Sequence, residues 1–166
     1  MTQFPVSSNH SIMVGGYEAA RFLEFEQGAE VGAALIMPGD LVEFTNPPAD
    51  CSVRAGQADS TTVIGVAKIH AVGTDTPPRG STRESEGVYE AGDMVEIVNG
   101  PITVMLRIAA SQDIQCGEMV QPAASGEVMA YICGTDEPCQ LIAQALETTA
   151  ADTTTFQWAM FQLRMG

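Results

Sequence analysis

A short phrase built on glycine and an acidic residue occurs three times in this chain, at Pro38–Glu43, Ala91–Glu96 and Cys116–Gln121. Each copy begins with a small residue or proline, continues with glycine and an acid, and ends with a large aliphatic residue, Val, and Glu or Gln. Glycine permits backbone conformations that other residues resist, and the acid can accept hydrogen bonds from nearby backbone N–H groups. The phrase therefore predicts a tight turn that leads into a strand.

A chain that repeats the same turn-and-strand motif is expected to fold into a compact β-structure. We predict that the glycine and the acid of each copy form structural turn motifs. These residues are Gly39, Asp40, Gly92, Asp93, Gly117 and Glu118.

Other segments also favour strands over helices. Val63–Ala67 is rich in β-branched residues around Gly65, which predicts a buried strand with a bulge or a close backbone approach. Asn99-Gly100-Pro101 separates two apolar runs, which is typical of a β-hairpin. The segment 141–146 has residues that favour a helix, but it aligns with Val63–Ala67 and is predicted to be a strand. The fold class is mainly β, a single partly open β-barrel or β-sandwich.

Two polar segments lie outside this pattern. Residues 1–16 are expected to form an extended N-terminal arm, followed by one β-domain over 17–166. Residues 73–87 are rich in turn formers and predict one long loop, which is either functional or a solvated tip. Side chains in these segments or at their boundary are candidate contacts to a capsid or to a neighbouring subunit, against the alternative of simple exposure to solvent. They are Phe4, His10, Tyr17, Arg79 and Arg83.

The charge balance excludes several partners. The 166 residues carry 21 acids against 7 bases, a formal net charge of -14. Such a surface repels nucleic acid and anionic lipid. The sequence contains no apolar run long enough to span a membrane, and its first residues do not resemble a secretory signal. The scarcity of lysine is consistent either with solubility through like charge or with adaptation to high salt.

The inventory of reactive groups is small and argues against an enzyme. His10 and His70 are the two histidines, and no spacing typical of a metal site, a phosphate loop or a serine nucleophile is found. Calcium bound at the acidic turns is conceivable, but turn capping accounts for those acids. We expect no metal and no cofactor. The spacing of Cys133 and Cys139 leaves open whether they form a disulfide or stay as free thiols.

The order of these motifs resembles that of capsid decoration, or cement, proteins of tailed viruses. The matching segments are 38–44, 63–67, 91–97, 116–128 and 143–163, whereas the arm and the loop 73–87 have no match. The resemblance implies a partly open β-barrel or β-sandwich that sits on the outer capsid lattice of the virion, often as a trimer, binds the major capsid protein, and is made in the host cytoplasm. If the acidic composition reflects high salt, a virus of a halophilic archaeon fits.

Two further functions compete with this hypothesis. A receptor- or carbohydrate-binding β-module of a virion spike or turret is the main alternative, but it needs an exposed aromatic platform. The chain has one tryptophan, Trp158, which lies in a core-like segment, and three tyrosines. A small barrel enzyme is disfavoured by the reactive groups described above.

Overall fold

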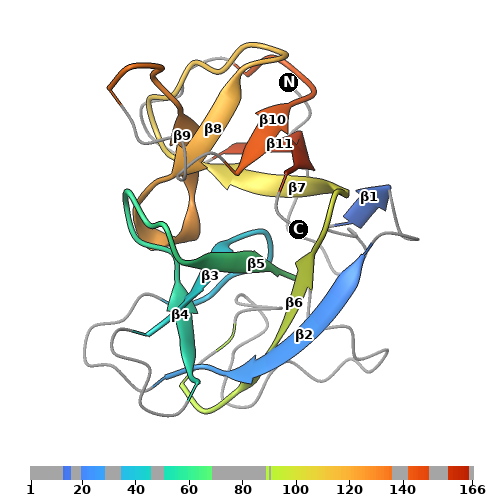
Figure 1. Cartoon of the computed structure of the whole chain (residues 1–166), viewed down its shortest axis with the longest axis vertical. Coiled ribbons are helices and arrows are strands. Elements are labelled where there is room, and N and C mark those ends of the chain that lie inside the picture. The colour runs from blue at the N-terminus through green and yellow to red at the C-terminus, as the bar shows by residue number, and fades with distance from the viewer. Residues whose placement is uncertain are drawn as a thin grey trace.

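The computed structural model confirms that the protein is mainly β, and the residues that it describes form eleven strands in two sheets (Figure 1). The described part of the chain contains no α-helix, and a short 3-10 turn spans Ala124–Gly126. The structure describes residues 13–15, 20–28, 35–45, 51–68, 89, 91–135, 142–149 and 157–164.

The first sheet closes into a small five-stranded barrel, the lower one in Figure 1. Its strands are paired antiparallel in the order β2-β6-β5-β3-β4. A parallel bridge between Gln27 and Val53 joins the end of β2 to β4 and closes the ring at one point. The strands are β2 (Arg21–Glu26), β3 (Leu41–Phe44), β4 (Val53–Ala55), β5 (Val63–Ala67) and β6 (Met94–Asn99).

The second sheet forms the upper barrel in Figure 1, with the order β7-β11-β10-β8-β9 and with β1 added beside β7. A parallel pair, Ile108 with Val128, joins β7 to β9 and closes this ring. The strands are β1 (Met13–Gly15), β7 (Thr103–Ile108), β8 (Met119–Pro122), β9 (Val128–Ala130), β10 (Ala143–Ala145) and β11 (Gln157–Leu163).

The two barrels have the same topology. When five is added to each strand number of the lower barrel, its order becomes that of the upper barrel. The backbone contacts that close the rings also match, because Gly28 N–H donates to Val53 O and Ala109 N–H donates to Val128 O, both at 2.9 Å. The single β-domain expected over 17–166 thus contains two equivalent barrels.

The repeated glycine phrase is the entrance to equivalent strands, β3 and β8. The N–H groups of Gly39 and Gly117 donate to the carbonyls of Ala67 and Ala145, each at 2.8 Å. Both alanines donate back, at 2.8 Å, to the carbonyl of the acid that follows the glycine. The φ angles of Gly39 and Gly117 are 84° and 93°, a left-handed conformation that favours glycine.

The middle copy of the phrase leads into β6 and has the same hydrogen bonds. Gly92 N–H donates to Gln27 O at 3.0 Å, and Gln27 N–H donates to Asp93 O at 2.9 Å. Gly92 also has a positive φ, 90°. The lower barrel therefore uses this turn twice, and the copy at Gly92 holds Gln27, the residue whose bridge to Val53 closes the ring.

The predicted close approach at Gly65 is confirmed. A Cβ atom at this position would lie 2.5 Å from Ile97 Cγ2 and 2.6 Å from the Val98 carbonyl oxygen. The pairing of β3 with β5 also shifts register beside Gly65, between Val42 and Glu43. Gly65 thus lets β5 bulge while it packs tightly on β6.

Each barrel has its own apolar core, and the larger core continues across the junction between them. Residues of the lower barrel, Leu41, Val66 and Val98, belong to the same buried cluster as Leu106 and Phe161 of the upper barrel. The second cluster fills the lower barrel: Ile36, Val42, Val53, Ala55, Ala67, Tyr89, Val95 and Ile97. Apolar burial therefore stabilises each barrel and also holds the two together.

Two sequence predictions need correction or extension. The hairpin predicted at Asn99-Gly100-Pro101 is wrong, because β6 pairs with β2 and β5 whereas β7 pairs with β11 and β1. This turn is the link between the barrels. In contrast, the strand predicted over 141–146 is present as β10. The end of the predicted arm, Met13–Gly15, is a strand of the upper sheet.

Candidate docking surface

The predicted contact residues Phe4, His10, Tyr17, Arg79 and Arg83 all lie outside the described residues. The same holds for the loop 73–87. The sequence-based assignment of these side chains to a capsid or subunit contact therefore stays a prediction. The predicted turn residues lie within the described part of the chain. Two of them, Asp40 and Glu118, have very different surroundings.

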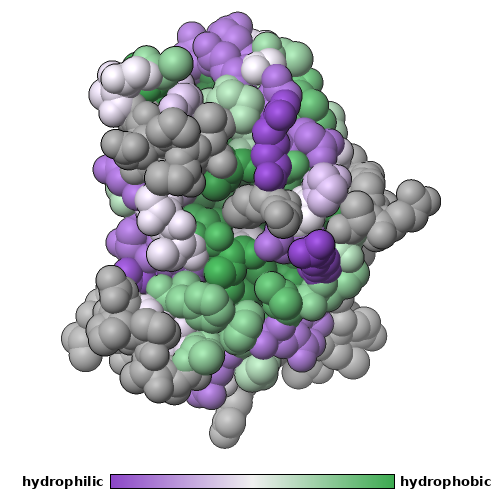
Figure 2. Space-filling model, viewed as in Figure 1, coloured by the Kyte–Doolittle hydropathy of each residue, from purple (hydrophilic) through white to green (hydrophobic). Residues whose placement is uncertain are grey.

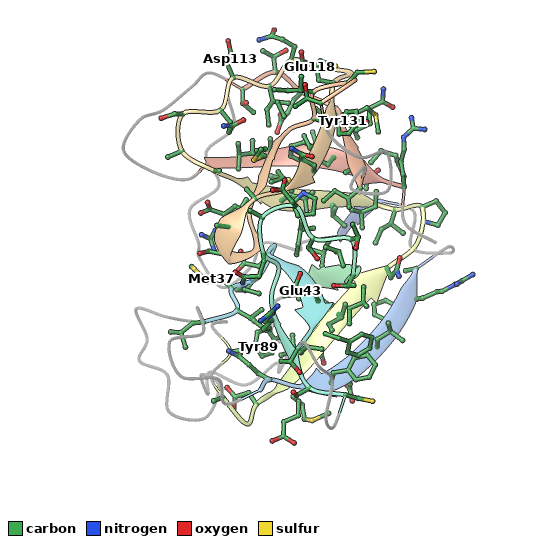
Figure 3. All side chains as sticks on the ribbon, turned by 60° about the vertical axis from the view of Figure 1, so that its left-hand side comes forward. Met37, Glu43, Tyr89, Asp113, Glu118 and Tyr131 are labelled. Atoms are coloured by element: carbon green, nitrogen blue, oxygen red, sulfur yellow. The ribbon has the colours of Figure 1, made fainter. Side chains whose placement is uncertain are left out.

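Asp40 and Glu118 cap equivalent turns in the same way. Asp40 Oδ2 accepts from Met37 N–H at 2.7 Å, and Glu118 Oε2 accepts from Gln115 N–H at 2.8 Å. Figure 3 shows Glu118 at the far end of the upper barrel and Met37 close to the place where the barrels meet. One copy of the turn is therefore exposed, and the other is built into the junction.

A buried ion-pair cluster joins the barrels at that place. Arg107 of β7 donates from Nη1 to Asp40 Oδ1 and from Nη2 to Glu127 Oε1, each at 2.6 Å. The Asp40 side chain has no exposed surface, and Arg107 is 8% exposed. Charge-assisted bonds of this length are strong and directional. Together they fix how the upper barrel is oriented on the turn that enters β3.

Asp40 makes the stability of this junction dependent on pH. Burial raises the pKa of Asp40 from 3.8 to about 7, and Arg107 only partly opposes this. Between these two values the folded protein binds more protons than the unfolded chain, so stability falls as the pH rises from about 4 to about 7. We expect Asp40→Asn to flatten this slope. Urea unfolding at pH 5 and pH 8 measures it, and equal slopes for both proteins would contradict the assignment.

The outer surface of the lower barrel has an apolar area. Figure 2 shows apolar surface over β2, β5 and β6. Phe22 is 58% exposed, and Lys68 Nζ lies 5.3 Å from the centre of its ring. Phe22 and Lys68 line a groove of about 340 Å³ together with Leu23, Glu24, Glu96 and Ile97. The lining combines apolar groups with two carboxylates and one ammonium group, which suits binding of an apolar segment that carries no negative charge.

The described residues offer little for chemistry. Among them, no three His, Cys, Asp or Glu side chains lie close enough to hold a metal ion. Cys51, Cys116 and Cys133 are exposed free thiols. In the same part of the chain, no helix has the length and apolar character needed to cross a membrane.

Sequence reasoning missed the role of Arg107. The alternation in 103–108 places Arg107 on the opposite side from Val104 and Leu106, which by itself suggests exposure to solvent. The available signal was that Arg107 follows three consecutive apolar residues, Val104 to Leu106, within a strand. Its partners, Asp40 and Glu127, could not be identified because they come from turns distant in sequence.

No family model matches this chain, and no curated protein matches it. Among solved structures, the chain is similar to the N base of the head fiber protein gp8.5 of bacteriophage phi29, with 13% sequence identity and a TM-score of 0.50. The match covers 86% of this chain and 94% of that chain. At this identity the likeness establishes a shared fold.

Proposed function

We propose that this protein is a virion structural protein that binds the outer surface of a capsid lattice and stabilises it. The observation that carries the proposal is the shared fold with a phage head fiber base, over nearly the full length of both chains. The order of the glycine-led motifs, which resembles that of capsid decoration proteins, supports the same role independently of the structural comparison.

The physical character of the molecule fits this role. The two barrels share a buried core and a buried ion-pair cluster, which suits a molecule that spans a seam between subunits. Many copies on a lattice need only modest affinity each. In this proposal the partner is the major capsid protein, the protein is a homo-oligomer with a trimer favoured, and it has neither turnover nor a cofactor. A halophilic archaeal host stays a prediction from composition.

The test is binding of the recombinant protein to capsids that lack it, measured by cosedimentation and by the temperature at which the shells open. We expect binding and a higher opening temperature. Failure to bind, or absence of the protein from purified virions, would contradict the proposal. Specific binding to a glycan array without capsid binding would instead favour the spike or turret module.

The predicted contacts at Arg79 and Arg83 can be tested in the same assay. We expect Arg79→Glu and Arg83→Glu each to weaken capsid binding by about tenfold at low salt, because in this proposal each arginine pairs with acidic groups of the capsid lattice and the substitution reverses its charge. The effect should shrink as salt rises. The matched control is Arg164→Glu, an exposed arginine of the described part. An equal loss in the control would show a general charge effect and no specific contact.

A further inference from the structure

The two equivalent barrels differ at one strand edge. In the upper barrel, β1 lies along the outer edge of β7, with Met13 paired to Val104 and Gly15 beside Thr103. In the lower barrel, none of the described strands pairs with the corresponding edge of β2. Unpaired strand edges present N–H and C=O groups that can pair with another extended segment.

The matching topology locates the equivalent positions on β2. Val104 pairs with Phe161, and Leu23 pairs with Ile97. Phe161 and Ile97 are equivalent because they pair with Ala145 and Ala67. These are the two alanines that are hydrogen-bonded to the turns at Gly117 and Gly39. The positions that bind β1 in the upper barrel therefore correspond to Leu23 and Phe22 in the lower one.

These two residues are the exposed apolar residues of β2. Phe22 is 58% exposed and Leu23 is 37% exposed, although most large apolar side chains of the barrels are buried. Both line the groove of about 340 Å³ described above, whose acidic members are Glu24 and Glu96. An open strand edge beside exposed apolar side chains is the surface used for β-strand addition.

We propose that the outer edge of β2 binds residues 1–12 of a second copy of this chain as an added strand. The absence of acidic side chains favours this segment over other parts of this acidic chain. The first 17 residues contain no acid, in a chain with 21 acids and a net charge of -14. They include Phe4 and Val6, which can occupy the groove without repulsion from Glu24 and Glu96.

The direction of β1 favours a neighbouring copy over the chain's own arm. Because β1 runs antiparallel to β7, its N-terminal end points along β7 towards Ile108, and its other end lies near Thr103. The link that begins at Asn99 joins this other end of β7 to the lower barrel, and Arg21 of β2 pairs with Asn99. The first residue of an arm that leaves β1 is thus directed away from the chain's own β2, which favours pairing with the β2 of another copy.

The test compares the full chain with a variant that lacks residues 1–12 and keeps β1. Sedimentation velocity, without any capsid, should show an oligomer for the full chain and a smaller species for the deletion. A fluorescent peptide of residues 1–12 should bind the deletion variant. Phe22→Glu in that variant should weaken peptide binding by about tenfold or more, whereas Ile132→Glu, the matched control on the upper barrel at 59% exposure, should not.

Each outcome of these experiments either supports or overturns the proposed exchange of the arm between copies. Peptide binding that is lost in Phe22→Glu, together with an arm-dependent oligomer, supports the proposal. A monomeric full chain whose deletion variant still binds the peptide shows that the arm folds onto its own barrel and overturns the exchange between copies. Absence of peptide binding overturns the site itself. Because no capsid is present, failure here leaves the proposed capsid role unaffected. Circular dichroism verifies that each variant is folded.

Discussion

Replacing Arg107 with methionine is expected to lower the free energy of unfolding by about 3–5 kcal/mol at pH 8, the cost typical of breaking a buried ion pair from one side. The substitution keeps much of the side-chain volume and removes the charge. Asp40, which has no exposed surface, then loses its cation at 2.6 Å. Urea unfolding monitored by Trp158 fluorescence or by circular dichroism gives the free energy.

Two comparisons separate the loss of the ion pair from the loss of packing. At pH 5 the Arg107→Met variant should regain part of its stability, because protonated Asp40 no longer needs a cation. Lys68→Met is the control. The Lys68–Glu96 pair is half-buried, with a distance of 3.6 Å, and its loss should cost less than about 1 kcal/mol. If Arg107→Met lowers the free energy of unfolding no more than Lys68→Met does, the ion-pair cluster does not stabilise the fold.

The double variant Asp40→Asn with Arg107→Met provides a further check. It removes the buried acid and the buried base together, so it should be more stable than Arg107→Met alone. If the losses in free energy of unfolding of Asp40→Asn and Arg107→Met simply add in the double variant, Asp40 and Arg107 act independently and are not coupled across the junction.

The sequence predicted those parts of the fold that depend on local chemistry. Gly39 and Gly117 could be placed in left-handed turns because glycine tolerates that conformation. Gly65 could be placed at a close approach because a glycine within a β-branched run has few other reasons to occur there. Even the alignment of Val63–Ala67 with 141–146 follows from pattern, and these segments are the equivalent strands β5 and β10.

The pairing of strands could not be predicted in the same way. Asn99-Gly100 is a strong hairpin signal, yet β6 and β7 belong to different barrels. Gly100 has a φ of 119°, so the local turn forms as its residues require. What the turn connects depends on which strands bury the neighbouring apolar residues, and that information is distributed over both barrels. The same limit applies to the partners of Arg107.

Replacing Gly126 with alanine is expected to destabilise the protein by about 2–5 kcal/mol. Gly126 lies in the turn between β8 and β9 and has a φ of +77°, which costs an alanine about 1–2 kcal/mol. A Cβ atom there would also lie 2.5 Å from Asp40 Cβ and 2.8 Å from Asp40 Cγ. Relieving this overlap must shift the turn of the upper barrel away from the lower one, at a further cost of about 1–3 kcal/mol.

Gly117→Ala isolates the backbone contribution in the same barrel. Its φ is +93°, but a Cβ atom would meet nothing within 4 Å, so only the conformational cost of about 1–2 kcal/mol is expected. The difference between the two variants, measured by thermal and urea unfolding, reports the contact between the barrels. It should shrink when Asp40 is replaced with alanine in both backgrounds, because the overlap with Asp40 Cγ is then gone. Equal losses for Gly126→Ala and Gly117→Ala would mean that the turn between β8 and β9 does not rest on Asp40.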